Sequence, residues 1–189
     1  KEKIRQQVNE VAKSLDGQPL IDSALLDEVS GLVEWPVAIS GSFEERFLEV
    51  PQEALIASMQ GHQKFFPVVN QNNQLMAHFI TVSNIESRDP SMVQAGNERV
   101  IRPRLSDAAF FWEQDLNKPL ESRQEGLKKV VYQDKLGSLL DKSERVAKLA
   151  STIATQLNAN PQHASRAAML AKCDLLTNMV KEFPELQGI

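Results

Sequence analysis

The spacing of apolar residues changes near Pro90, and this change constrains the fold more than any single motif does. Before Pro90, short apolar runs of strand length alternate with helical segments and turn residues. After it, apolar residues recur every three or four positions, as in helices. The pattern predicts an α+β fold: a mixed region of helices and antiparallel strands (residues 1–117), a connecting segment (118–131) and an all-helical region (132–189).

Capping and turn residues divide the mixed region into elements. We expect a first helix that stops near Gly17 and a second one that Asp22 or Ser23 caps and that extends to about Glu34. We expect strands in VAISG and RFLEV, and a helix in QEALIASMQ that Gly61 closes. The runs KFFPVV and LMAHFITVS, separated by NQNNQ, predict a hairpin. Its proline, Pro67, requires a sheet edge or a bulge.

Two amphipathic helices are expected in the all-helical region. The first should bury a stripe made of Leu139, Val146, Ala150, Ile153 and Leu157. Asn160 and Pro161 can open the second, which should continue through Phe183. Its buried stripe is expected to contain Met169, Cys173, Leu176, Val180 and Phe183.

The stretch GNERVIRPRLSDAAFFWEQD, residues 96–115, concentrates arginines and aromatic residues. On a helix, its core stripe would contain Ile101, Leu105, Ala108, Ala109, Trp112 and Leu116. Pro103 indicates either a kink or a helix start. The side chains of Arg99, Arg102 and Arg104 either pair with acidic neighbours or contact phosphates, because the arginine fork suits both kinds of oxygen.

Charge and composition limit the classes of partner. The net charge of −4 argues against binding to polyanions in general, so any contact with nucleic acid needs a local basic patch. No run of apolar residues reaches the roughly 20 that a membrane span needs, and we expect neither a membrane nor a DNA partner. The one cysteine excludes an internal disulfide and fits a reducing, cytoplasmic compartment.

Catalytic motifs are missing from the sequence. The three histidines, His62, His78 and His163, include no His-Asp dipeptide of the kind that a metal phosphohydrolase needs. The eight glycines form no phosphate loop. Cys173 lies on an apolar stripe, where a thiol behaves as a small hydrophobe. We therefore expect no catalytic residue and no metal ligand.

Several long segments in order resemble one family. These are LVEWPVAISGSFEERFLEVPQEAL, HQKFFPV, VSNIESRDP, the stretch 96–115 and KCDLLTNMVKEFPELQG. They resemble the beta subunit of the bacterial two-subunit glycyl-tRNA synthetase, and the resemblance extends roughly from Asp22 to the end of the chain. It implies a heterotetramer in which the alpha subunit carries the class II active site and uses ATP and magnesium. The resemblance also implies that the beta subunit engages tRNA(Gly).

The resemblance makes specific expectations for this chain. We expect an internal fragment of the beta subunit, cytoplasmic and inactive without the alpha subunit, whose helical region is the start of an HD-like domain. Arg99, Arg102 and Arg104 become candidates for RNA contact, and the polar loop of His62, Gln63 and Lys64 becomes a second candidate. Two alternatives stay open: a purely structural scaffold that binds the alpha subunit without RNA contact, and an HD-type metal phosphohydrolase.

Overall fold

The computed structural model describes residues 1–189, which form two compact units, Lys1–Phe110 and Phe111–Ile189. Helices and a four-stranded antiparallel sheet confirm the α+β class. The finer division expected from the sequence, with a connecting segment at 118–131, stays a prediction. None of the helices combines the length and the apolar character that a bilayer-spanning segment requires.

Unit 1 is built on a sheet with the strand order β1-β3-β4-β2. The strands are β1 (Gln18–Pro19), β2 (Val37–Ser42), β3 (Phe66–Val69) and β4 (Leu75–Ser83), and all neighbours are antiparallel. The predicted β3–β4 hairpin is confirmed, with Asn70 accepting hydrogen bonds from the backbone of its turn. Pro67 lies at a register shift in β3, which confirms the expected bulge.

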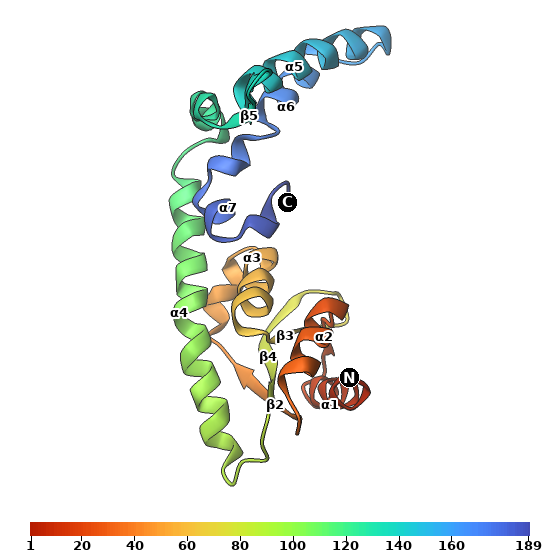
Figure 1. Cartoon of the computed structure of the whole chain (residues 1–189), viewed down its shortest axis with the longest axis vertical. Helices are drawn as coiled ribbons and strands as arrows, with labels where there is room; N and C mark the ends of the chain where they lie inside the picture. The colour runs from red at the N-terminus through yellow and green to blue at the C-terminus, as the bar shows by residue number, and fades with distance from the viewer. The chain divides into compact units, whose positions relative to one another are not determined.

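Two helices cover one face of this sheet (Figure 1). They are α1 (Glu2–Ser14) and α2 (Ser23–Leu32), and Asp22 caps α2 by accepting a hydrogen bond from the backbone N–H of Leu25 at 2.9 Å. Even-numbered residues of β4, such as Ile80, point to this side because side chains alternate along a strand. The resulting core contains Ile4, Val8, Ala12, Leu25, Leu26, Val29, Phe66, Val68 and Ile80.

The segment RFLEV is not the strand that we expected. Residues Glu45–Glu49 form a 3₁₀-helix, η1. Phe47 and Val50 are buried and the residues between them are exposed. That three-residue period matches a 3₁₀ turn rather than the two-residue period of a strand.

The helix after Pro51 extends further than expected. It is α3 (Gln52–Ala57), and a π-helical turn, η2 (Ser58–His62), continues it through Gly61. Gly61 therefore does not close the helix. The left-handed backbone conformation instead falls on Lys64, whose φ is 58°, directly before Phe65 stacks on Phe79 with ring centroids 4.5 Å apart.

The longest helix, α4 (Pro90–Leu116), starts at Pro90 and passes through Pro103, so Pro103 is not a helix start. Its residues up to Phe110 belong to unit 1, where they run along the side of the sheet opposite α1 and α2 (Figure 1). Ile101, Leu105 and Ala108 are buried as predicted. Leu116 is 64% exposed, so its assignment to the core stripe is wrong.

Unit 2 contains strand as well as helix. Its helical elements are η3 (Leu120–Lys129), α5 (Leu139–Gln156), α6 (Pro161–Leu170), η4 (Cys173–Leu176), α7 (Asn178–Glu182) and η5 (Pro184–Leu186). A two-stranded ribbon pairs β5 (Val131–Gln133) with β6 (Gly137–Ser138), so the expectation of an all-helical region is wrong. The ribbon was missed because its strands are too short to show a period.

The expected helix from Asn160 to Phe183 is broken into pieces. Asn160 does cap α6, by accepting from the backbone N–H of His163 at 3.0 Å. The chain leaves the helix after Leu170 and restarts at α7, where the hydroxyl of Thr177 accepts from the backbone N–H of Val180. The predicted buried stripe is confirmed in part, since Cys173 and Phe183 are buried.

The prediction that the apolar stripe of α5 is buried is wrong. Val146, Ile153 and Leu157 are 42%, 53% and 73% exposed. The buried side chains of α5 are Leu140, Ser143, Ala147 and Ala154, mostly small, next to an alanine-rich α6. Small side chains allow two helices to approach closely, so α5 turns its small face toward α6 and leaves its larger apolar face outside.

Candidate nucleic-acid interface

Arg102 has a structural role in unit 1. Its Nε atom lies 2.7 Å from Oε1 of Glu44, and this ion pair connects α4 to the segment after β2. One turn earlier, Glu98 accepts hydrogen bonds from the backbone N–H and hydroxyl of Ser42, at 2.9 and 3.0 Å. These contacts bind α4 to the end of the sheet, so the interpretation of an arginine paired with an acidic neighbour holds for Arg102.

Glu98 is held in its charged form by these contacts. Burial raises the pKa of its carboxyl group, but hydrogen bonds from Gln94 and Ser42 and the nearby charge of Arg102 outweigh this effect and lower the pKa below its ordinary value. Glu98 and Glu44 thus supply negative charge beside Arg102, which reduces what Arg102 can offer to a phosphate.

Arg99 and Arg104 differ from Arg102. Both are exposed on α4, and neither forms a salt bridge or a side-chain hydrogen bond; the possible i,i+3 pair between Arg104 and Asp107 is absent. Val100, exposed next to them at 50%, gives this part of α4 a mixed basic and apolar surface. Of the three predicted arginines, these two therefore keep their guanidinium groups available.

The second predicted site, at residues 62–64, is only partly available. The Nζ atom of Lys64 lies 3.0 Å from Oε2 of Glu28 on α2, which neutralises part of its charge. His62 is exposed at the end of η2. Phe65 and Phe66, which follow, are buried in unit 1. The loop is thus a polar cover above the hairpin whose lysine already has a carboxylate partner.

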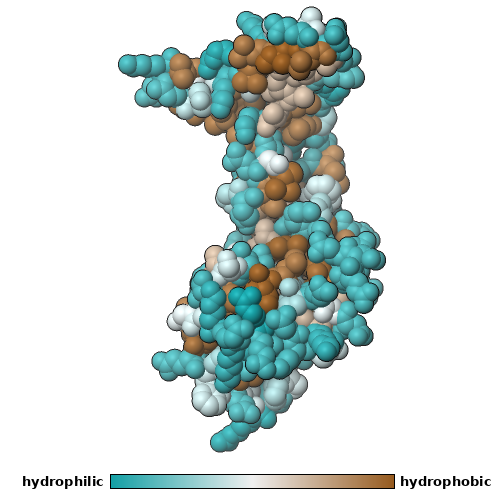
Figure 2. Space-filling view, turned by 90° about the vertical axis from the view of Figure 1, so that its right-hand side faces the viewer, coloured by the Kyte–Doolittle hydropathy of each residue, from teal (hydrophilic) through white to brown (hydrophobic).

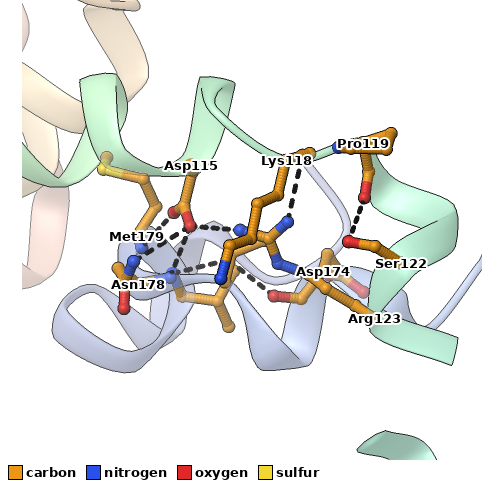
Figure 3. Close-up of polar contacts among 10 residues, drawn as sticks. Asp115, Lys118, Pro119, Ser122, Arg123, Asp174, Asn178 and Met179 are labelled. Atoms are coloured by element: carbon orange, nitrogen blue, oxygen red, sulfur yellow. Dashed lines mark hydrogen bonds and ion pairs between the residues drawn. The ribbon is translucent and has the colours of Figure 1, made fainter. Parts of the chain in front are cut away.

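A largely buried carboxylate, which no feature of the sequence indicated, organises unit 2 (Figure 3). Asp115 accepts hydrogen bonds from the side chains of Arg123 and Asn178, at 2.5 and 3.2 Å. It also accepts from the backbone N–H groups of Asn178 and Met179, at 3.0 and 2.9 Å. Asp115 therefore fixes the start of α7 against the end of α4, over 63 positions of sequence.

The side chains form no cluster that could hold a metal ion. No group of three or more histidine, cysteine, aspartate or glutamate side chains is close enough to hold a metal ion. His163 and Asp174 lie in different elements, and Asp174 accepts from the backbone N–H of Gly188 at 2.8 Å. Burial raises the pKa of the Cys173 thiol, which makes it a poorer nucleophile.

Comparison with known proteins places these features in a family. The family model for the glycyl-tRNA synthetase beta subunit matches residues 1–189. The glycine–tRNA ligase beta subunit of Chromohalobacter salexigens is 57% identical over 189 residues, which are 100% of this chain and 28% of that protein. The same subunit of Marinobacter nauticus is 59% identical over an alignment of 190 positions, which covers 100% of this chain and 27% of that protein.

A third relative, the glycine–tRNA ligase beta subunit of Hahella chejuensis, is 57% identical over 185 residues, covering 98% of this chain and 27% of that protein. The chain therefore spans little more than a quarter of the length of these relatives. Since the family model matches every residue of it, the chain belongs to the glycyl-tRNA synthetase beta subunit family.

Proposed function

We propose that this chain is the part of a glycine–tRNA ligase beta subunit that engages tRNA(Gly) and helps to assemble the enzyme with its alpha subunit. Ligation would use ATP and magnesium in the alpha subunit, and the chain alone would be inactive. Membership of the family and the names of the relatives support this proposal. A role in charging tRNA also implies a cytoplasmic location.

The observation that carries the proposal is the pair of unpaired arginines on α4. In this chain with a net charge of −4, Arg102 and Lys64 each have an acidic partner. Arg99 and Arg104 have none, and their planar forks can donate two parallel hydrogen bonds to phosphate oxygens. We expect them to contact the RNA backbone, and we expect Arg102, His62 and Lys64 to contribute less.

Two further parts of the proposal are less specific. Unit 2 would be the beginning of an HD-like domain, although a metal phosphohydrolase is disfavoured because His163 and Asp174 lie in separate elements. The alternative of a scaffold without RNA contact is favoured by the exposed apolar face of α5, which is suited to a protein partner. The two roles are compatible, since they use different surfaces.

A salt series of tRNA(Gly) binding tests the proposal. We expect the affinity of the chain to fall steeply as salt rises, and the double variant Arg99→Ala, Arg104→Ala to show a shallower slope. Each lost phosphate contact should flatten the slope of log K against log salt by about 0.7 to 0.9. A matched control removes two exposed cations of unit 1 that lie outside α4 and form no salt bridge, Lys13→Ala and Arg88→Ala.

The two doubles remove the same charge, so a general electrostatic effect would change both slopes equally. Equal slopes would contradict a contact at α4. Binding of the alpha subunit without any binding of tRNA would favour the scaffold. Glycylation of tRNA by the chain alone would overturn the assignment of catalysis to the alpha subunit.

A further inference from the structure

A hollow in unit 2 gathers basic side chains. It has a volume of about 340 Å³ and lies between the end of α4, the start of η3 and α7. Three of its lining residues are cations, Lys118, Arg123 and Lys181, and no carboxylate lines it. A pocket with this composition, in an acidic chain, is suited to an anion.

The neighbouring carboxylate does not cancel this charge. Asp115 lies behind the hollow, where it is already saturated by Arg123, Asn178 and the backbone N–H of Met179. One negative charge therefore offsets Arg123 and leaves the two lysines. Lys118 and Lys181 are exposed and form neither a salt bridge nor a side-chain hydrogen bond. Their ammonium groups are available to a ligand.

Neutral donors accompany the lysines. Gln114 and Asn117 line the same hollow, and their side-chain amides have no hydrogen-bond partner within the chain. Figure 3 shows Lys118 and Arg123 reaching toward Asn178 from the segment that follows α4. Asp115 holds Arg123 and Asn178 in place, so the lining is preorganised rather than assembled from flexible side chains alone.

We propose that this pocket, which we call the Lys118–Lys181 pocket, binds a phosphate group, and that an RNA backbone supplies it. The choice of RNA rests on the proposed function. Two ammonium groups with amide donors and no acidic competitor match the charge and the acceptor oxygens of a phosphodiester. The volume of about 340 Å³ admits a phosphate with its adjoining sugar. The pocket would be a second contact, built from unit 2, independent of the arginines on α4.

The test uses the variant Lys118→Gln, Lys181→Gln. Glutamine keeps most of the aliphatic stem and removes the charge, and Arg123 is left intact because its loss would disturb Asp115. The control, Lys135→Gln with Lys148→Gln, removes two exposed lysines of the same unit that do not line the pocket. Backbone amide NMR spectra of all proteins verify that unit 2 stays folded.

Two measurements separate the source of the phosphate. In the tRNA(Gly) salt series, we expect the pocket variant to flatten the slope by about 0.7 to 0.9 for one lost phosphate contact and the control to leave it nearly unchanged. In a titration with inorganic phosphate and with adenosine monophosphate, backbone amide NMR shifts at Lys118, Ser122 and Asn178 report occupancy. This titration does not depend on tRNA binding.

A flattened slope without response to the small ligands supports RNA as the source. Saturable amide shifts that disappear in the pocket variant support phosphate binding and assign the site to a free phosphate or nucleotide, even if tRNA binding fails. Unchanged slope and unchanged amides would overturn the pocket. If the chain binds no tRNA while the amides respond, the proposed function fails and the pocket survives.

Discussion

Replacing Asp115 by alanine is predicted to destabilise unit 2 strongly. The side chain of Asp115 is 9% exposed and that of its partner Arg123 is 11% exposed, so the pair is almost completely removed from water. Deleting the carboxylate leaves a desolvated guanidinium, whose remaining acceptor is the backbone carbonyl of Lys118 at 3.2 Å. It also leaves the N–H groups of Asn178 and Met179 without their acceptors.

The size of the effect follows from these contacts. Removing one partner of a buried ion pair costs about 3–5 kcal/mol. The two backbone donors would each lose a hydrogen bond to a charged group, worth about 1.5–3 kcal/mol. These costs are not additive, because α7 can detach and expose its N–H groups to water. The new alanine also stabilises α4 by about 0.5 kcal/mol, because its helix propensity exceeds that of aspartate. We therefore expect a loss of about 3–5 kcal/mol for Asp115→Ala.

The variant Asp115→Asn separates charge from geometry. Its amide retains one oxygen of the right shape, so one or two of the hydrogen bonds survive, and we expect a smaller loss of about 1.5–3 kcal/mol. Because the chain has two units, a single unfolding midpoint does not report on unit 2 alone. The assay is native-state hydrogen exchange of amides in α7 and η4, read as local free energies of opening.

The result that would refute this reasoning is a small effect. If Asp115→Ala lowers the opening free energy of α7 by less than about 1 kcal/mol, the network is worth no more than an exposed pair. The exposed pair of Glu121 and Arg166 in the same unit supplies the comparison. Glu121→Ala should leave exchange in α7 nearly unchanged, and an equal effect of both substitutions would show that burial is not what strengthens Asp115.

Three further predictions test the packing and capping described above. A methyl group added at Gly41 would lie 2.3 Å from the ring of Phe79, so Gly41→Ala should destabilise unit 1 by about 1–3 kcal/mol. Gly31, in α2, has open space around it, so Gly31→Ala should instead stabilise unit 1 by about 0.5–1 kcal/mol in the same denaturant titrations. If both substitutions changed the free energy of unfolding in the same direction, the close contact at Phe79 would be contradicted. Asp141 closes a capping box with Ser138, and hydrogen bonds from the backbone N–H and hydroxyl of Ser138 lower its pKa. Its stabilisation of α5 should be present above the ordinary pKa of about 3.9 and be lost as pH falls through the lower folded value, which carboxyl NMR titration and amide exchange at Asp141 would show. In Ser138→Ala the backbone N–H still donates to Asp141, so the pKa of Asp141 should return only part of the way toward its ordinary value. A pKa that the substitution leaves unchanged would exclude the hydroxyl as a cause.

The local signals in the sequence predicted the local structure well. Asp22 and Asn160 cap helices where expected, and the NQNNQ turn joins a hairpin. Each of these depends on side chains within a few residues of the backbone they stabilise. Pro67 at its bulge belongs to the same class, because its missing N–H restricts any strand that contains it.

The wrong predictions of buried faces have a common physical cause. Where two apolar faces of an element show similar periodicity, packing against a neighbouring element determines which face is buried. On α5, large and small apolar faces lie side by side, and the sequence favoured the large one. Close approach of an alanine-rich α6 selected the small one. Figure 2 shows apolar residues on the surface of the part that contains α5 and α6. A periodicity argument measures apolar character and carries no information about the shape of the neighbouring helix.

The candidate site shows the same division between local and distant information. The sequence placed three arginines together on α4, but it could not say which of them has a carboxylate partner, because Glu44 is far from Arg102 along the chain. Asp115 and Asn178 are likewise joined over 63 positions. In an acidic chain, distant carboxylates decide which cations stay free, so the fold itself separates the structural Arg102 and Arg123 from Arg99, Arg104, Lys118 and Lys181. The proposed RNA contacts are therefore chosen from the cations that form no ion pair, and their place on α4 and in the Lys118–Lys181 pocket sets them apart.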